Sequence, residues 1–65
     1  MRGSAFDAGD WVVIHAKDDF FAFVDGWRGT VQGTNEGLYE VACMRPDGMK
    51  TLFVPADQLA LTVRS

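Results

Sequence analysis

Hydrophobic and polar residues follow one another in short runs along this chain, and turn-forming residues separate the runs. Glycine, asparagine and a Pro-Asp-Gly sequence recur at short intervals, and no segment keeps a helical period of apolar residues for three turns. This pattern is typical of a small all-β fold. It predicts five strands, at residues 10–16, 27–33, 38–44, 49–54 and 59–63.

The expected turns contain the residues that such turns need. Residues 45–48, Arg-Pro-Asp-Gly, predict a hairpin because proline fixes φ and glycine accepts positive φ. Residues 34–37 predict a second turn. Pro55 cannot donate a ladder hydrogen bond, so it ends the fourth strand, and residues 55–58 are expected to form one turn of 3-10 helix.

Three short motifs stand out within these strands. They are Gly9-Asp10-Trp11-Val12, Gly26-Trp27-Arg28-Gly29-Thr30-Val31 and Phe53-Val54-Pro55. Over residues 6–63 the chain resembles a group of bacterial and plastid SH3-like barrels: KOW-type modules, the PsaE-like photosystem subunit, the variable chain of ferredoxin–thioredoxin reductase and type II dihydrofolate reductase. The resemblance implies a five-stranded SH3-like barrel with a long first loop and a 3-10 turn before the last strand.

Length and composition fit one small domain. The chain has 65 residues, of which 48% are hydrophobic, enough for a single packed core. Residues 1–4, Met-Arg-Gly-Ser, resemble an expression-vector leader, so the domain is predicted to cover residues 5–65. Cys43 is the only cysteine in the sequence, which excludes an internal disulfide, and it is expected to be a buried apolar residue.

The charge of the chain argues against a nucleic-acid partner. The net charge is −3, and the six lysines and arginines are scattered rather than clustered. No apolar run approaches membrane-spanning length, and the N-terminus lacks the pattern of a signal segment. These features predict a cytoplasmic protein with neither a nucleic acid nor a membrane as its partner.

The period of two along a strand assigns side chains to opposite faces. The resemblance of the first motif puts Val12 inside, and the predicted core is then Val12, Ile14, Val31, Val41, Phe53, Leu59 and Leu61. The opposite parity predicts an outward apolar face made of Trp11, Val13, Leu52, Val54 and Met44. A contiguous apolar patch marks an interface, so this face is predicted to bind a protein partner or a second copy. A register slip of one residue, which would exchange the two faces, is the alternative.

Residues 18–31 place aromatic side chains between acidic ones. A barrel of this size would be overpacked if all of them pointed inward, so we expect Phe21 or Phe23 to close one end and the others to be partly exposed near Trp27. Acidic residues beside exposed aromatic rings suit a cationic peptide. The loop site predicted in this way comprises Phe20, Phe21, Phe23, Trp27, Asp18, Asp19 and Asp25.

No catalytic constellation is evident, and no metal or other cofactor is expected. His15 is the only imidazole in the sequence and has no predictable carboxylate or thiol partner. We therefore predict a non-enzymatic protein-interaction or assembly module. The enzyme alternative comes from the resemblance to type II dihydrofolate reductase, a homotetramer with a Val-Gln-Ile-Tyr run before the proline. This chain has Thr51-Leu52-Phe53-Val54 there, without the Gln and the Tyr.

Overall fold

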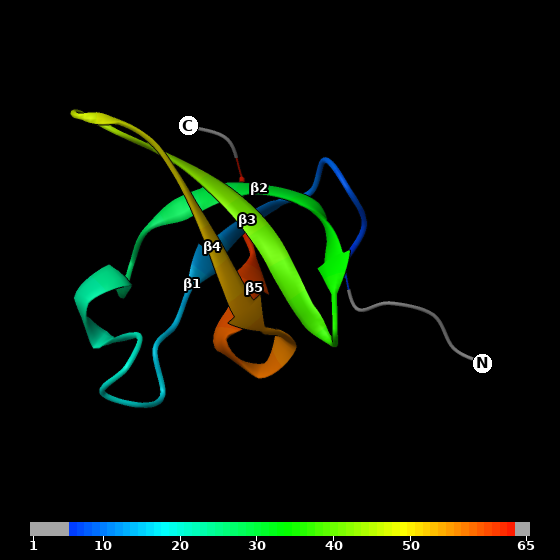
Figure 1. The fold of residues 1–65 in the computed structure, drawn as a ribbon, viewed down its shortest axis with the longest axis horizontal. Helices are drawn as coiled ribbons and strands as arrows, with labels where there is room; N and C mark the ends of the chain where they lie inside the picture. Colours follow the sequence, from blue (N-terminus) through cyan, green and yellow to red (C-terminus); the bar gives the residue numbers. More distant parts are fainter. Residues whose placement is uncertain (1–5, 64–65) are drawn as a thin grey trace.

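Residues 6–63, the part of the chain that the computed structural model describes, confirm the predicted all-β fold (Figure 1). The five antiparallel strands are β1 (Trp11–Ile14), β2 (Arg28–Asn35), β3 (Leu38–Arg45), β4 (Gly48–Pro55) and β5 (Leu59–Leu61). Two 3-10 turns accompany them, η1 (Ala22–Val24) in the first loop and η2 (Ala56–Gln58) before the last strand. The predicted leader, residues 1–4, lies outside the described residues.

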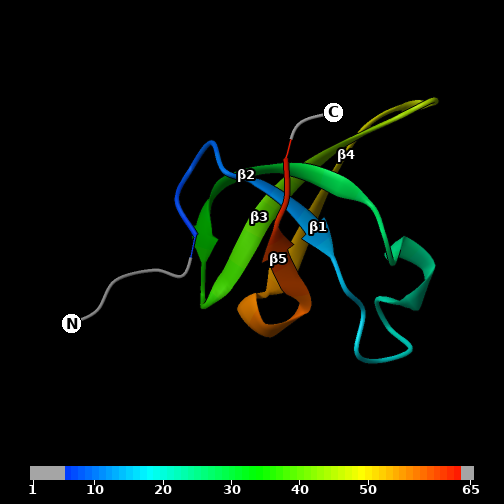
Figure 2. The same ribbon diagram turned by 180° about the vertical axis from the view of Figure 1, so that it is seen from behind.

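The strands form one sheet in the order β4-β3-β2-β1-β5. This sheet curls back on itself, so that β3 and β4 lie in front of β1 and β5 in Figure 1 and behind them in Figure 2. A β-bulge between Val31 and Gly33 interrupts the β2–β3 pairing and increases the local bend. The architecture is compatible with an SH3-like barrel, but the sheet is open, with β4 and β5 as its two edges.

β1 is shorter than predicted because its backbone hydrogen bonds leave the ladder after Ile14. The amide of His15 donates to the Gln58 carbonyl at 2.8 Å, and the amide of Ala16 donates to Asp25 Oδ1 at 2.8 Å. A polar side chain and a 3-10 turn therefore take the bonds that a neighbouring strand would have taken. The first loop begins at this point.

The core lies between the two layers of the curled sheet. Five of the seven predicted core residues are buried there: Val12, Ile14, Val31, Val41 and Leu59. The other two predictions are wrong, because Phe53 and Leu61 are exposed. The remaining buried hydrophobic residues are Phe6, Phe21, Val24, Tyr39, Cys43 and Val54.

The register of the β3–β4 hairpin explains the error in β4. Val41 pairs with Leu52 and Tyr39 pairs with Val54, so these four side chains share the inner face of the sheet. Val54 is 0% exposed and Leu52 packs against the core. Phe53 projects from the opposite face, where it is 43% exposed. The inner and outer residues of β4 are therefore the reverse of those predicted.

The predicted interface face does not exist as a single surface. Trp11 and Val13 lie half-buried on the outer side of β1, whereas Leu52 and Val54 point into the core from β4. Only Met44 of the predicted β3 and β4 members is exposed on the outer face. The exposed apolar residues on the outer face of β3 and β4 are therefore a different set from the predicted one.

Candidate functional site

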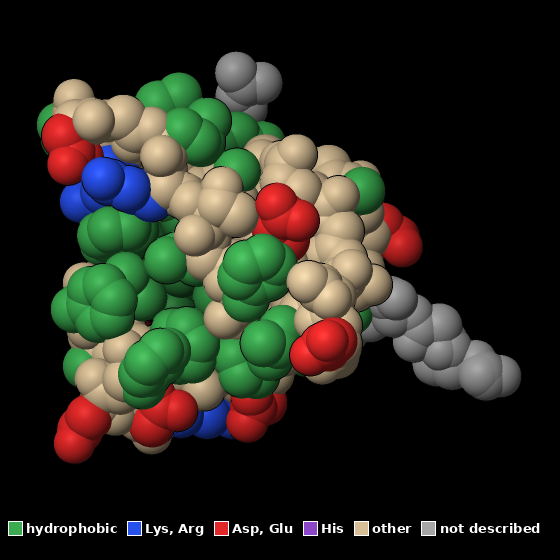
Figure 3. Space-filling model, in the orientation of Figure 1, with side chains coloured by type: hydrophobic (Ala, Val, Ile, Leu, Met, Phe, Trp, Pro, Cys, Tyr) green, Lys and Arg blue, Asp and Glu red, His purple; other side chains and the backbone are tan. Residues whose placement is uncertain are grey.

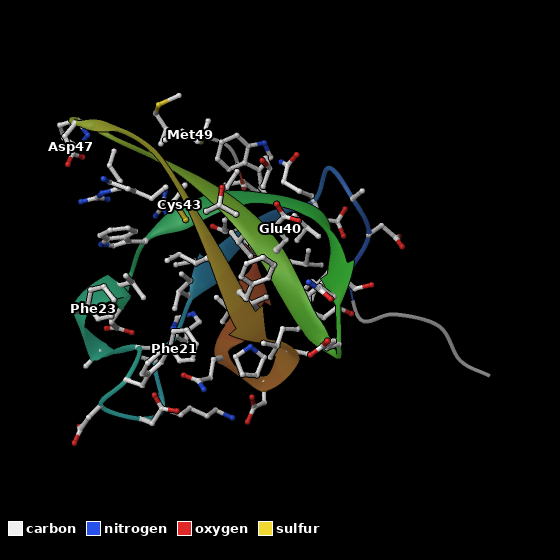
Figure 4. All side chains as sticks on the ribbon, in the orientation of Figure 1. Phe21, Phe23, Glu40, Cys43, Asp47 and Met49 are labelled. Atoms are coloured by element: carbon white, nitrogen blue, oxygen red, sulfur yellow. The ribbon has the colours of Figure 1, made fainter. Side chains whose placement is uncertain are left out.

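The first loop, residues 18–27, is called here the aromatic loop. It contains the 3-10 turn η1, in which the Val24 amide donates to the Phe21 carbonyl at 3.0 Å. Side chains three residues apart overlie one another in a 3-10 turn. Phe21 and Val24 accordingly both point into the core, as Figure 4 shows for Phe21.

The same spacing sends the other two phenylalanines of the loop outward. Phe20 is 74% exposed and Phe23 is 72% exposed. Phe20 contacts the edge of the buried Phe21 ring, with centroids 4.9 Å apart, and Phe23 lies on the far side of the loop from the core (Figure 4). Of the two residues predicted to close one end of the barrel, Phe21 is buried and Phe23 is exposed, and Phe20 is exposed as well.

A buried glutamine holds the aromatic loop in place. Gln58, in η2, is 4% exposed, and its Oε1 accepts a hydrogen bond from the Lys17 amide at 3.0 Å. Its Nε2 donates to Asp18 Oδ2 at 3.2 Å, while Asp18 Oδ1 accepts from the Phe21 amide at 3.0 Å. The sequence analysis missed Gln58, because nothing in its neighbourhood distinguishes it from a surface glutamine. These bonds fix the loop on the N-terminal side of η1, and the hydrogen bond from the Ala16 amide to Asp25 Oδ1 fixes it on the C-terminal side.

The acidic residues of the loop divide into two kinds. Asp18 and Asp25 hold backbone amides, those of Phe21 and Ala16. Asp19 is exposed at the surface. An open hollow of about 310 Å³ lies beside these residues, lined by Ala16, Lys17, Asp18, Asp19, Ala22 and Asp25. Within residues 6–63 no group of three or more metal-binding side chains is close enough to hold an ion.

Trp27 lies at the end of the loop and is only half-exposed, since it packs against the core. The guanidinium carbon of Arg45 lies 4.1 Å from the centroid of its ring, which is a cation–π contact. One face of the Trp27 ring therefore already has a cation supplied by the chain itself. The exposed aromatic surface of this loop consists of Phe20 and Phe23.

Among residues 6–63, neither the thiol of Cys43 nor the imidazole of His15 belongs to a group of three or more His, Cys, Asp or Glu side chains that could hold a metal ion. Cys43 is fully buried, and burial raises the pKa of its thiol, an effect that the charge of Arg45 partly opposes. The thiolate needed for nucleophilic attack is thus disfavoured. His15 is exposed.

A second exposed surface lies on the outer face of β3 and β4, and is called here the outer-face patch. It consists of Met44, Met49 and Phe53. Met44 pairs with Met49 across the hairpin, and Phe53 pairs with Glu40. Figure 4 shows Met49 near the hairpin end and Glu40 towards the middle of β3. Neither Met49 nor Phe53 belonged to the predicted interface.

Comparison with other proteins leaves the candidate sites to be judged on geometry. No protein-family model matches this chain, and a search among curated proteins finds no match. Among residues 6–63, no helix has both the length and the apolar character that crossing a membrane requires.

The anchoring of the aromatic loop can be tested by Gln58→Leu, which keeps the buried volume but removes the hydrogen bonds to Lys17 and Asp18. We expect the free energy of unfolding to fall by about 1–2 kcal/mol, because two polar groups lose a partner. Amide hydrogen exchange over residues 15–27 should accelerate. Gln32→Leu is the control: it removes an exposed side chain whose Nε2 donates to Thr30 two residues away on β2, and it should change neither. Unchanged exchange in Gln58→Leu would contradict the anchoring role.

Proposed function

We propose that this domain is a non-enzymatic protein-interaction module whose aromatic loop binds a segment of another protein. One observation carries the proposal: two phenylalanines, Phe20 and Phe23, are more than 70% exposed on a loop that the buried Gln58 holds in place. Scattered apolar side chains on a surface need no explanation, but two strongly exposed aromatic residues three positions apart on one anchored loop favour a binding site.

The energetics of such a loop favour binding. Burying a phenylalanine side chain is worth roughly 1.5–3 kcal/mol. Ordering a loop on binding offsets much of that gain, but the aromatic loop is already ordered by the hydrogen bonds of Asp18, Asp25 and Gln58. Most of the energy of covering Phe20 and Phe23 therefore remains available for affinity.

The charge of the loop indicates the chemistry of the partner. Residues 17–25 contain Asp18, Asp19 and Asp25 against Lys17, and the whole chain has a net charge of −3. A partner segment with lysine or arginine beside apolar residues would complement both the charge and the aromatic surface. Its affinity should fall as salt is added, because these charges are exposed.

The structure lends the enzyme alternative no support. Type II dihydrofolate reductase has a central pore lined by the outward faces of its sheets. In the enzyme alternative, the strand before Pro55 would present its side chains to such a pore between subunits. Here Val54 is fully buried and Leu52 packs against the core, so of the four residues directly before Pro55 only Thr51 and Phe53 face outward. The resemblance to SH3-like barrels therefore contributes a scaffold to this proposal and no catalytic role.

Selection from a random peptide display library tests the proposal. We expect enriched peptides to combine basic and apolar residues, and to lose at least about tenfold in affinity for the double variant Phe20→Ser/Phe23→Ser, since each ring contributes a buried contact. Leu61→Ser, which removes another exposed apolar side chain on β5, is the matched control and should bind like the native chain. Peptides that bind the double variant equally well, or that are mainly acidic, would contradict the proposal.

A further inference from the structure

β4 is a long strand at an open edge of the sheet. It runs for eight residues, Gly48–Pro55, and within the described chain its only neighbouring strand is β3. Half of the backbone N–H and C=O groups of an edge strand point away from its single neighbour and can pair with another strand. The residues of its first half, 48–51, are all exposed. Figure 3 shows hydrophobic side chains gathered around this strand and towards the aromatic loop.

The outer face of β4 is apolar at both ends and symmetric about its centre. Met49 is 55% exposed, Phe53 is 43% exposed, and Thr51 lies midway between them on the same face. In an antiparallel pair of identical strands related by a two-fold axis, Thr51 of one copy opposes Thr51 of the other. Met49 of each copy then opposes Phe53 of its partner, a sulfur–aromatic contact in each half of the interface.

The backbone favours this register over the one centred on Leu52. Only residues whose polar groups point to the same edge can pair, so the two-fold axis must pass through a residue pair rather than between residues. Centring on Thr51 pairs residues 48–54 and leaves Pro55, which has no N–H to donate, outside the ladder. Centring on Leu52 would bring Pro55 into the ladder and would separate Met49 from Phe53.

The two ends of β4 carry complementary charge. At the hairpin end, Arg45 and Lys50 outnumber Asp47. At the η2 end, Asp57, Asp18 and Asp19 outnumber Lys17, and hydrogen bonds of Gln58 join the loop to η2. In Figure 3 the basic side chains lie at the upper left beside the hairpin, and acidic ones lie along the lower edge. Antiparallel docking puts the basic end of each copy beside the acidic end of the other.

We propose that β4 pairs antiparallel with β4 of a second copy of this chain, with the two-fold axis at Thr51, to form a continuous ten-stranded sheet. In this dimer the two Lys50 side chains lie diagonally opposite each other on the inner face of the sheet. Each has its own counter-ion, because Lys50 Nζ lies 3.4 Å from Asp47 Oδ2. The apolar and backbone contacts of this interface come from β4 and do not include Phe20 or Phe23, so a dimer would present two aromatic loops.

Sedimentation equilibrium of the native chain, and of variants with charged residues at positions 49 and 53, tests the proposal. The mass should rise from the 7.2 kDa monomer towards twice that value between micromolar and near-millimolar concentration. Met49→Glu alone and Phe53→Lys alone should each weaken the dimer about tenfold or more, because each change affects two symmetric pairs. The double variant Met49→Glu/Phe53→Lys should restore association, since Glu and Lys then oppose each other.

Crosslinking tests the register independently. Directly opposed Cα atoms in an antiparallel pair lie about 4.5–5.5 Å apart, which a disulfide can span. Thr51→Cys should therefore form a covalent dimer under mild oxidation. Thr34→Cys, an exposed residue of β2, is the control and should form much less. Cys43 is buried in the core and should stay reduced in both.

The possible outcomes separate this proposal from its rivals and from the proposed function. A chain that remains monomeric throughout, with no enrichment of the Thr51→Cys dimer, overturns it. If the native chain dimerises but the double variant Met49→Glu/Phe53→Lys does not, the dimer uses another surface, and this result overturns the proposal too. Phe20→Ser/Phe23→Ser should dimerise like the native chain, and loss of the dimer in that variant would assign association to the aromatic loop instead.

Discussion

The variant Gly29→Ala is expected to be largely unfolded. A Cβ atom at Gly29 would lie 2.3 Å from the backbone oxygen of Ala42 and 2.9 Å from the Sγ of Cys43. The first contact is with the backbone of the neighbouring strand, which cannot move without breaking the β2–β3 ladder. Overpacking of this kind costs about 3 kcal/mol or more. That is comparable to the whole stability that a core of this size supplies.

Gly33→Ala is the matched control, with the same substitution on the same strand. The structure has nothing within 4 Å of a Cβ atom at Gly33, and its φ is not in the positive region. Its stability should lie within about 1 kcal/mol of the native value, since a strand interior slightly prefers alanine to glycine. Urea unfolding followed by tryptophan fluorescence compares the two variants. Equal stabilities would show that β2 and β3 are not packed as described.

The strand pattern was predictable because the chain marks its turns clearly. The structure has β2 end at Asn35 and β3 begin at Leu38, with positive φ at Glu36 and Gly37, a two-residue turn inside the predicted one. Val31 lies between Thr30 and Gln32 in β2, and Val41 lies between Glu40 and Ala42 in β3, so their burial followed from period two. The strand ends were predicted less accurately, because side chains end strands in ways that periodicity does not show: Asp25, for example, accepts the hydrogen bond of the Ala16 amide just after the end of β1.

The error in β4 came from reading each strand separately. Residues 45–48 predict a tight hairpin, and pairing Arg45 with Gly48 makes residue Val41 oppose Leu52. A buried Val41 then requires Leu52 and Val54 on the inner face. The alternation of Leu52, Phe53 and Val54 has no polar residue to identify the outer side, so periodicity alone could not decide. Combining the turn with the known face of β3 would have placed Phe53 outside.

The aromatic loop shows a different limit of sequence reasoning. That one phenylalanine must be buried followed from the size of the core, but the choice of Phe21 depends on η1, a single 3-10 turn with no propensity signal. The acidic residues were predicted to form a charged surface, and all three are exposed, but Asp18 and Asp25 also accept hydrogen bonds from backbone amides. Asp18 also bonds to Gln58, 40 residues away, and Asp25 bonds to Ala16, 9 residues away, so the sequence around each aspartate gives no sign of these contacts.

The variant Val54→Lys is expected to unfold the domain. Val54 is 0% exposed and lies opposite the buried Tyr39 on the inner face, so a lysine there places an ammonium group among apolar side chains. An unpaired charge in such a site typically costs more than about 4 kcal/mol, beyond what a small core tolerates. Circular dichroism and urea unfolding at low protein concentration measure the loss.

Phe53→Lys differs from this variant by a single position and should fold normally. Phe53 is partly exposed and opposes Glu40, so the new ammonium group reaches solvent and faces a carboxylate directly across the strand pair. Its free energy of unfolding should stay within about 1 kcal/mol of the native value. If Phe53→Lys unfolds the domain and Val54→Lys does not, β4 is shifted by one residue. The outer-face patch would then lose Phe53, and the two-fold pairing of β4 would lose the contact between Met49 and Phe53.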